Sequence, residues 1–553
     1  MPTTTHNSQT RARPGSRTLT RRHFWTINFS TRVHLVPSHL SNTQPRPFIR
    51  IEVTMGNARA QLDNLAWDKN DEASEISQKR LRRRDTCELA ASLAGQKFGR
   101  KATFTPPLII GGYNILYKVQ IEGMASGVYV RLPCPDWVQF PIEKTLQEGA
   151  TARYVKQHTQ IPVPKVFFYG ENSDLGPFMI LQHVENCGLM VNRMKTPNPD
   201  PDVPSVLDLN ISDSVLSDFY GKAARCLLQT SRLSFDRIGS LSENEDSTFS
   251  VTGRPLSKNM NDMLQLANIP RAVLPPEIKT YSTTDEWYEA LAEMHMAQLI
   301  FQHNDLVTTE DDCRNKYVAR QLFRRLAKEH RLSSFGFADD DWSAQSKTWS
   351  SQISQAPSNL GSFRLWADDF RPGNILVDDS EDVVAVIDWE LSYAAPTQFT
   401  LDCPWWLLLE VPESWKPDID DWTKVYATRL QTWLSAMEKA EKDMGSETLP
   451  FILSTHMRES WETGRFWLNY AAKNSWAFDT VFWKYLDEKL FGTREEDVPT
   501  DNIWRTRIHL LSEKERVAME RFVEWKMEDK KERILVDWDP EEAKQRLSDL
   551  LFD

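Results

Sequence analysis

The side chains best suited to chemistry are concentrated in one short segment, residues 366–390. Asp369 is followed five residues later by Asn374, and the strand-like run Val383–Ile387 leads directly into Asp388. Phosphoryl transfer needs a carboxylate near the attacking hydroxyl and oxygen ligands that hold Mg²⁺ on nucleotide phosphates. A hairpin between Asn374 and Asp388 would bring all three side chains to one edge. The spacing therefore predicts a phosphoryl-transfer centre at Asp369, Asn374 and Asp388.

The expected hairpin is indicated by two strand-like runs, Asn374–Val377 and Val383–Ile387, on either side of the polar turn sequence 378–382. Short aliphatic runs separated by polar turn residues are typical of antiparallel strand pairs. An Asp-x4-Asn pattern alone is weak evidence, and a polar turn beside a strand is the alternative without function. The pattern gains specificity because the hairpin ends in Ile-Asp-Trp-Glu at residues 387–390.

The elements that must position this centre fall into two groups. Residues Cys87 to about Val184 are expected to form a small unit of strands with a helix at Glu143–His158. The predicted strands are Ala102–Ile110, Ile115–Ile121, Val128–Leu132, Lys165–Phe168 and Phe178–Gln182.

Helical patterns dominate after the Pro- and Asp-rich segment at residues 196–204. The second unit is therefore expected to be mostly α. Its predicted helices are Asp213–Leu233, Asp285–His303, Glu310–His330, Ile419–Asp443, Phe451–Ala472, Asp479–Leu490, Ile508–Lys526 and Pro540–Leu551.

The composition excludes several classes of protein. At 553 residues and 40% hydrophobic content the chain is long enough for two or more packed units, and no apolar run is long enough to cross a bilayer. Six cysteines are scattered singly, which predicts reduced thiols rather than disulfides or a zinc site. Residues 1–54 carry eight Arg and a single acidic residue, which leaves a charge of −19 for the remainder. Nucleic-acid binding by the main body is therefore not expected.

The N-terminal segment has a composition of its own. Up to Ile51 it contains Arg, Ser, Thr and apolar residues but no Asp or Glu, which is typical of a mitochondrial transit peptide. A disordered tail and an upstream extension before a start at Met55 are the two alternatives. We expect a cytoplasmic protein, or a mitochondrial one if the segment is a genuine transit peptide.

The segment around Asp369 resembles the aminoglycoside phosphotransferase and choline kinase-like family, whose catalytic loop reads roughly His-Gly-Asp-x-His-x-x-Asn and whose metal motif reads Ile-Asp-Trp or Ile-Asp-Phe. By that resemblance Asp369 is the catalytic aspartate, and Asn374 and Asp388 are the metal ligands. Residues 372–374 match the common Pro-Gly-Asn variant, and residues 387–390 match fungal members. The implied fold is α+β and bilobal, protein kinase-like, with an antiparallel sheet and one helix in a small N-lobe and a large, mainly helical C-lobe.

The resemblance extends to the nucleotide side of the small lobe. Gly111, Gly112 and Asn114 match the turn that covers the nucleotide, where small residues let backbone donors approach phosphate. Arg131 lies where the family ordinarily has a phosphate-binding Lys, and Glu148 matches the helix glutamate that would pair with it. Arg keeps the charge, but its planar fork is not interchangeable with an ammonium.

The strand Phe178–Gln182 resembles the one that runs into the hinge between the lobes, so Gln182 and Val184 are expected to present backbone groups to adenine. The chain divides accordingly into three parts. The first is an N-terminal extension at 1–85, with a transit peptide and a disordered segment as alternatives. The second is a nucleotide-binding N-lobe at 86–184, and the third is a C-lobe at 185–553 with the catalytic loop and a helical substrate-side region.

The catalytic loop departs from the family pattern at two positions. Ala367 stands where the family has His, and Arg371 where a second His or a neutral residue is common. A guanidinium at position 371 would stabilise charge on the transferring phosphoryl group, or it would pair with Asp368 at the surface. Beyond the metal motif, Asp402 is expected to hold the catalytic loop by hydrogen bonds.

The sequence therefore predicts an ATP- and Mg²⁺-dependent phosphotransferase that acts on a hydroxyl of a small molecule. The alternative is a pseudokinase, a kinase-fold binding or scaffold protein without transfer activity. A protein kinase is a weaker third option, because the sequence lacks Gly-x-Gly-x-x-Gly, Asp-Phe-Gly and Ala-Pro-Glu. Aromatic residues between Trp461 and Tyr485 suggest a cage for a cation or a sugar ring, although aromatic residues at helical spacing more often form core.

Overall fold

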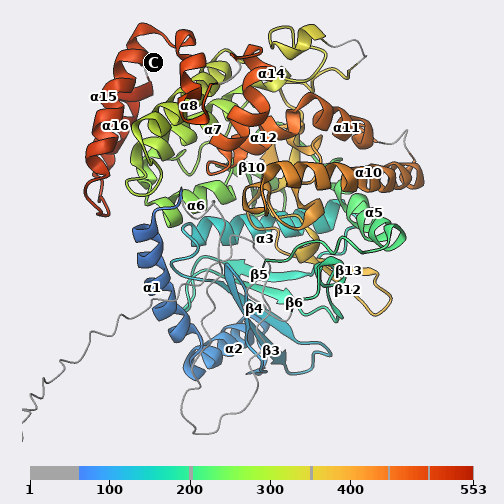
Figure 1. The fold of residues 1–553 in the computed structure, drawn as a ribbon. Coiled ribbons are helices and arrows are strands. Elements are labelled where there is room, and N and C mark those ends of the chain that lie inside the picture. Colours follow the sequence, from blue (N-terminus) through green and yellow to red (C-terminus); the bar gives the residue numbers. More distant parts are fainter. Residues whose placement is uncertain (1–60, 199–203, 349–352, 446–448, 496–497, 552–553) are drawn as a thin grey trace, which may run out of the picture.

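The chain forms two lobes (Figure 1). In the computed structural model, strands dominate the small lobe at the bottom of the view and helices dominate the large lobe above it. This is the α+β, bilobal architecture expected from the sequence. The transit-peptide prediction falls on residues 1–60, which lie outside the described part of the chain. The structure describes residues 61–198, 204–348, 353–445, 449–495 and 498–551.

An antiparallel sheet of six strands is the base of the small lobe. Its order is β1-β3-β4-β6-β5, and β2 pairs with β3. Ile115, Tyr117, Val119 and Ile121 alternate along β3 and are all fully buried, because every second residue of a strand points to the same face. The strands are β1 (Ala102–Phe104), β2 (Ile109–Ile110), β3 (Asn114–Ile121), β4 (Val128–Pro133), β5 (Val166–Gly170) and β6 (Phe178–Gln182).

Two helices pack on this sheet. Helix α2 (Arg84–Phe98) contacts β1 and β3, and its Ala90 and Ala94 join the core of the small lobe. Helix α3 (Pro141–His158) contacts β5 and β6, whereas its Ala150 and Val155 belong to the hydrophobic cluster of the large lobe. Helix α3 therefore lies between the sheet and the large lobe, where its polar residues reach the interface.

Helix α1 (Asn64–Leu81) spans both lobes. Asp63 caps the first turn of α1 by accepting hydrogen bonds from the N–H groups of Leu65 and Ala66, and the Asp63 N–H donates to the Leu266 carbonyl in the large lobe. Near the start of α1, Trp67 is fully buried against Leu266. At its other end, the Leu81 carbonyl accepts the hydroxyl of Tyr117 in the small lobe.

The large lobe has one continuous hydrophobic core. Helices α5 and α10 pack along each other, as do α7 and α8. The longer helices are α5 (Asp213–Thr230), α6 (Lys258–Ala267), α7 (Thr284–Phe301), α8 (Glu310–Lys328), α10 (Ile419–Met444), α11 (Leu453–Thr463), α12 (Arg465–Lys473), α15 (Glu513–Asp529) and α16 (Pro540–Leu551), and the shorter ones are α4 (Val191–Met194), α9 (Thr397–Thr400), α13 (Phe478–Val481) and α14 (Asp487–Phe491).

Two small sheets carry the predicted centre within this helical lobe. In the first, β12 (Ile375–Val377) lies between β13 (Val383–Val386) and β7 (Gly188–Leu189). The central strand of the second sheet leads into the catalytic loop. It is β11 (Phe363–Ala367), between β8 (Ser234–Phe235) and β14 (Ser392–Ala395), and the hairpin β9 (Ser240–Glu243) and β10 (Phe249–Gly253) packs nearby.

Several predicted elements differ from the structure. The run expected as one strand, 102–110, is divided into β1 and β2 by Pro106 and Pro107, which have no N–H for a ladder. The helix expected over Phe451–Ala472 is two helices, because Gly464 adopts a left-handed backbone with φ of +86° between them. The segment assigned to an N-terminal extension, 1–85, contains the ordered and partly buried helix α1.

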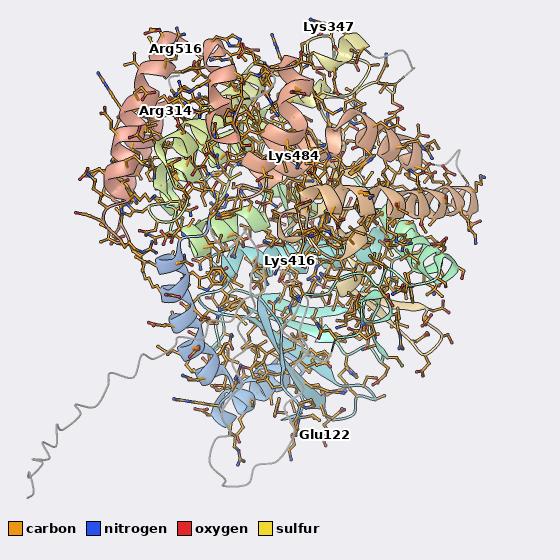
Figure 2. All side chains as sticks on the ribbon, in the orientation of Figure 1. Glu122, Arg314, Lys347, Lys416, Lys484 and Arg516 are labelled. Atoms are coloured by element: carbon orange, nitrogen blue, oxygen red, sulfur yellow. The ribbon has the colours of Figure 1, made fainter. Side chains whose placement is uncertain are left out.

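Side chains cover both lobes (Figure 2), from Glu122 just after β3 to Arg516 on α15. Within the described ranges, none of the helices combines the length and the apolar character that a bilayer crossing demands.

Candidate active site

The loop after β11 holds the predicted catalytic side chains close together. A single turn at 372–374 leads from this loop into β12. Asp369 Oδ2 accepts a hydrogen bond from Asn374 Nδ2 at 2.8 Å, and Asp369 Oδ1 pairs with Arg371 Nε at 2.7 Å. Both carboxylate oxygens of Asp369 are therefore held in a fixed direction, as a group that orients a substrate hydroxyl requires.

Arg371 lies against the backbone of the same turn. A Cβ atom at Gly373 would be only 2.7 Å from Arg371 Nη1, so a larger residue there would displace the guanidinium. The alternative pairing of Arg371 with Asp368 is wrong. Asp368 instead accepts hydrogen bonds from Trp366 Nε1 at 3.0 Å and from the Lys258 N–H at 3.1 Å.

Asp388 follows β13, and the hairpin brings it to the same edge as Asn374. The Ile387 N–H donates to the Asn374 carbonyl at 2.9 Å. Asp388 itself has a left-handed backbone with φ of +58°. This conformation costs free energy in a residue with a Cβ atom and is found disproportionately at functional sites. The structure therefore brings Asp369, Asn374 and Asp388 together as the spacing predicted.

A buried cluster of charged residues joins the two lobes beside Asp388. Arg131 on β4 forms an ion pair with Glu148 on α3 through Nη1. Its Nη2 pairs with Asp388 and lies 3.0 Å from Glu390 Oε2, both from the large lobe. The predicted contact between Arg131 and Glu148 is present, and the Arg fork additionally reaches the metal motif.

Lys144 completes this cluster, and the sequence analysis does not identify it. Lys144 Nζ lies 2.5 Å from Glu390 Oε2 and 3.6 Å from Glu148 Oε2. It also donates to Asn114 Oδ1 at 2.7 Å. Lys144 and Glu148 are four residues apart on α3 and so share one helix face. That spacing is the signal that could have found Lys144 in the sequence.

Burial changes the acid–base properties of these carboxyl groups. It raises the pKa of Asp369, although the nearby Arg371 opposes the shift. Burial also raises the pKa of Asp388. Glu390 differs, because attraction by Lys144 and hydrogen bonding outweigh the effect of burial and lower its pKa. Clustered carboxyl groups whose pKa values shift in opposite directions are typical of functional sites.

Three of the carboxylates could hold a metal ion. One oxygen from each of Glu148, Asp388 and Glu390 lies within 4.8 Å of the others. Mg²⁺ is bound by oxygen ligands, usually one or two carboxylates together with substrate phosphates, so this group of carboxylates fits that ion. Asn374 Nδ2 donates to Asp369 Oδ2. Glu390 places a further carboxylate beside Asp388, one of the two metal ligands predicted from the motif.

The predicted nucleotide-covering turn closes onto the large lobe. The Gly111 N–H donates to the Asn114 carbonyl at 2.8 Å, and Asn114 Nδ2 donates to Glu390 Oε2 at 2.8 Å. Between Gly112 and Asn114, the buried Tyr113 side chain packs in the hydrophobic cluster of the large lobe. The turn therefore contacts both the charged cluster and the opposite lobe.

The predicted hinge differs from expectation at Gln182. The Gln182 N–H donates to the Lys165 carbonyl at 2.9 Å, inside the sheet. The N–H of the next residue, His183, donates to the Gly127 carbonyl at 3.3 Å. These two donors are engaged by the small lobe itself, so the backbone contact to adenine predicted for Gln182 is wrong for its N–H. The carbonyl of Val184 accepts the Asn186 amide at 2.9 Å.

A cavity of about 130 Å³ opens beside the catalytic loop. Asp369 and Arg371 line one part of it, so the cavity reaches the predicted base directly. Leu62, just before α1, and Trp476 line another part. The site therefore has room for a small molecule next to Asp369, between α6, α12 and the loop after β11.

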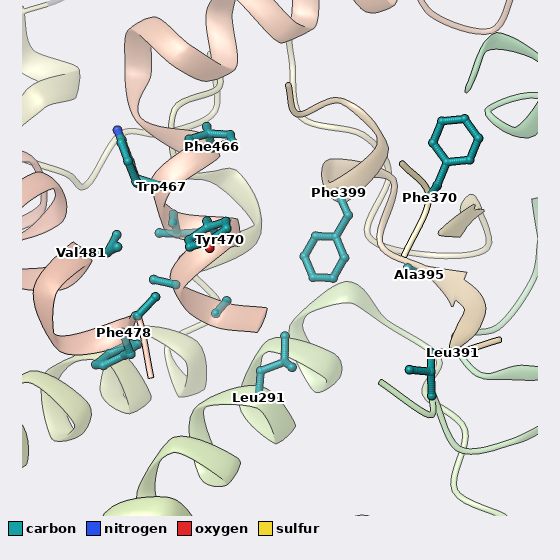
Figure 3. Close-up of a cluster of buried hydrophobic side chains, with 14 of the residues drawn as sticks. Leu291, Phe370, Leu391, Ala395, Phe399, Phe466, Trp467, Tyr470, Phe478 and Val481 are labelled. Carbon is teal, nitrogen blue, oxygen red and sulfur yellow. The ribbon is translucent and has the colours of Figure 1, made fainter. Parts of the chain in front are cut away.

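The aromatic residues of the large lobe divide between core and cavity. Figure 3 shows Phe466, Trp467 and Tyr470 on α12 within the hydrophobic cluster that also contains Phe399. Phe466 and Tyr470 line the cavity as well. In addition, the protein supplies a cation of its own, because Lys473 Nζ lies 3.8 Å from the centre of the Trp366 ring and 4.3 Å from that of Phe399.

Asp402 does not hold the catalytic loop as predicted. Its carboxylate accepts hydrogen bonds from Ser460 Oγ at 2.6 Å and Asn469 Nδ2 at 2.8 Å. Both partners come from the helices α11 and α12. Asp402 therefore anchors these helices beside the cavity.

Comparison with known proteins assigns the segment that carries this site. Residues 254–439 match the model described as "Phosphotransferase enzyme family". Asp369, Arg371, Asn374 and Asp388 all lie within the match. The resemblance inferred from the catalytic loop and the metal motif is confirmed. A comparison with curated protein sequences gives no significant match.

Solved structures to which this chain is similar include a macrolide 2'-phosphotransferase type I, at 13% identity and a TM-score of 0.33, with 73% of this chain and 95% of that chain covered. A thermostable aminoglycoside phosphotransferase mutant in ternary complex with AMP-PNP and hygromycin B has 13% identity and a TM-score of 0.33, covering 76% and 98%. An ethanolamine kinase from Plasmodium vivax has 12% identity and a TM-score of 0.34, covering 74% and 81%.

Proposed function

We propose that this protein is an ATP- and Mg²⁺-dependent phosphotransferase that transfers a phosphoryl group to a hydroxyl of a small molecule. One observation carries the proposal. The cavity beside α12 reaches the Asp369 carboxylate, which is fixed by Asn374 and Arg371 and belongs to the segment that matches the family model. A hydroxyl in that cavity would meet the carboxylate directly.

Each residue has a role in this proposal. Asp369 orients the hydroxyl and accepts its proton, and its raised pKa suits a group that must take up a proton during the reaction. Arg371 stabilises negative charge on the phosphoryl group. Asn374 and Asp388 would hold Mg²⁺, which when bound neutralises charge on the nucleotide phosphates. Arg131, which pairs with Glu148, would contact those phosphates.

The pseudokinase alternative is favoured by one specific observation. Arg131 forms an ion pair with Asp388, so the candidate phosphate-binding residue is engaged by the candidate metal ligand. A protein in which this pair never separates would retain the fold and the cavity without transferring a phosphoryl group. The two functions differ in whether Mg²⁺ supports turnover.

ATP hydrolysis and transfer with and without Mg²⁺, across a panel of small hydroxyl compounds, distinguish these functions. Asp369→Asn should lower turnover by roughly 10²–10⁴-fold, because the proton acceptor is lost, while ATP binding persists. Asp388→Asn should abolish the effect of Mg²⁺. Asp382→Asn, in the exposed turn of the same hairpin, is the matched control and should behave as wild type. Nucleotide binding without turnover under any metal condition would support the pseudokinase instead.

A further inference from the structure

A single carboxylate oxygen in the charged cluster receives three donors from the small lobe. Glu390 Oε2 lies 3.0 Å from Arg131 Nη2, 2.5 Å from Lys144 Nζ and 2.8 Å from Asn114 Nδ2. The donors come from three different elements, β4, α3 and the start of β3, and all of these side chains are buried. Three converging donors, two of them cationic, can bind a phosphate oxygen as well as a carboxylate oxygen.

The charges of the cluster also suit an anion from outside. Arg131 and Lys144 carry two positive charges, and within the small lobe only Glu148 is seen to pair with both of them. Glu390 comes from the large lobe, directly beyond the metal motif. Without Glu390, the pocket made by the small lobe would hold a net positive charge and three donors directed at one point.

Lys144 is better placed than Arg131 to release its ion pair with Glu390. Both terminal nitrogens of Arg131 are engaged, Nη1 by Glu148 and Nη2 by Asp388 and Glu390. Lys144 Nζ makes its shortest ion pair with Glu390, and its contact with Glu148 is longer, at 3.6 Å. An ammonium is a compact charge with rotatable donors, so it can exchange one oxygen for another without moving its helix.

We propose that Lys144, Arg131 and Asn114 form the phosphate-binding site for the nucleotide, and that Glu390 occupies the phosphate position while no nucleotide is bound. Lys144, from helix α3, supplies the ammonium that the strand position of Arg131 lacks. This inference rests on the proposed function, because it concerns the nucleotide of the same reaction. It adds a binding residue on α3 and an internal competitor for the nucleotide.

Once displaced by phosphate, Glu390 would serve as a metal ligand. Its carboxylate already lies with those of Asp388 and Glu148 in the group whose oxygens are within 4.8 Å of one another. When phosphate takes over the cations, this carboxylate becomes available as an oxygen ligand for Mg²⁺. Phosphate and metal then favour the same rearrangement, so each should strengthen the binding of the other.

Calorimetric titration of the full chain with ATP, in EDTA and in Mg²⁺, tests the inference. Glu390→Gln keeps the side-chain volume but removes the competing charge, and it should bind metal-free ATP about tenfold or more tightly than wild type. A gain in affinity cannot arise from misfolding. The same variant should lose most of the strengthening that Mg²⁺ gives to wild type. Equal or weaker binding of metal-free ATP by Glu390→Gln would overturn the inference.

Lys144→Met should weaken ATP binding about tenfold or more, because a charged hydrogen bond to phosphate is lost. Lys156→Met is the matched control, since Lys156 lies further along α3 and donates to the Val163 carbonyl instead. It should bind ATP as wild type does. If Lys144→Met also binds ATP as wild type does, Lys144 is not part of the phosphate site.

Titration with inorganic tripolyphosphate separates this inference from the proposed function. Binding that appears or strengthens in Glu390→Gln and disappears in the double variant Lys144→Met/Glu390→Gln supports the phosphate site, even if no transfer is ever detected. Transfer that persists while Lys144→Met keeps its full affinity for ATP supports the function and refutes the site. If Glu390→Gln binds neither ATP nor tripolyphosphate, the inference is overturned.

Discussion

Replacing Trp67 with Ala should detach the start of α1 from the large lobe. The Trp67 indole is fully buried in a cluster with Leu62 and Leu266. A buried aromatic side chain removes about 150–250 Å² from water, which at roughly 25 cal/mol per Å² is worth about 4–6 kcal/mol as an upper bound. Substitutions of buried Trp by Ala typically cost about 3–5 kcal/mol. We therefore expect the free energy of opening α1 to fall by about 4 kcal/mol.

Hydrogen exchange followed by mass spectrometry on peptides from residues 64–81 measures this opening directly. A loss of about 4 kcal/mol corresponds to roughly 10³-fold faster exchange wherever exchange follows local opening. The matched control is Ile76→Ala on the same helix, because Ile76 is 70% exposed. That substitution should change the free energy by less than about 0.5 kcal/mol.

The two variants also show whether the packing of Trp67 or the helix itself holds α1 in place. Ala favours the helix more than either residue it replaces, so similar acceleration in both variants would mean that the burial of Trp67 does not decide the stability of α1, and the argument from burial would fail. Unchanged exchange in Trp67→Ala would mean that the backbone contact between Asp63 and Leu266 is sufficient without the indole. Because Leu62 also lines the cavity, successful detachment should open the cavity to solvent.

Two further predictions concern reactive side chains. Burial lowers the pKa of Lys473 to about 8, so its labelling by an amine-selective reagent should follow a titration centred near pH 8, and a midpoint near the ordinary value of about 10.4 would contradict the burial argument. Between these two values the unfolded chain holds a proton that the folded chain has released, so stability should rise with pH in that window. Among the six cysteines only Cys187 is exposed, and a hydrogen bond from its thiol to Asp379 Oδ1 at 2.8 Å raises its pKa. Native protein should therefore react at one thiol, and Asp379→Asn should accelerate that reaction at pH 7; a slower or unchanged rate would refute the role of Asp379.

The sequence predicts a helix or strand well where the pattern of apolar residues lies within that element itself. The strands at Val128 and Phe178, helix α3 and the catalytic hairpin all occur within a few residues of their predicted bounds. Alternation and helical periodicity report which face of an element is buried, so they need no knowledge of the partner. For the same reason the edge that carries Asp369 and Asp388 could be predicted from spacing alone.

The remaining features depend on contacts between residues distant in the chain. The partners of Asp402 are 58 and 67 residues away, and no spacing rule connects them. Lys144 looks like one polar helix residue among many until α3 is placed between the sheet and the large lobe. The N–H of Gln182 is engaged by Lys165 because of strand pairing, which a motif match does not encode. Helix α1 is polar on most of its surface, so its packing against the large lobe is not evident from its sequence.

The short strand β7 has a consequence for motion between the lobes. The chain that leaves the hinge does not pass freely into the large lobe, because the Cys187 N–H donates to the Val377 carbonyl and the Met190 N–H to the Ile375 carbonyl. The segment after the hinge is therefore part of the sheet whose hairpin positions Asn374 and Asp388. When the lobes rotate relative to each other, residues 187–190 and the hairpin that positions Asn374 and Asp388 should therefore move together as one rigid body. The distances among residues 187–190, Asn374 and Asp388 should therefore stay constant when the lobes rotate. The distances from these residues to Arg131 and Lys144 in the small lobe should change far more.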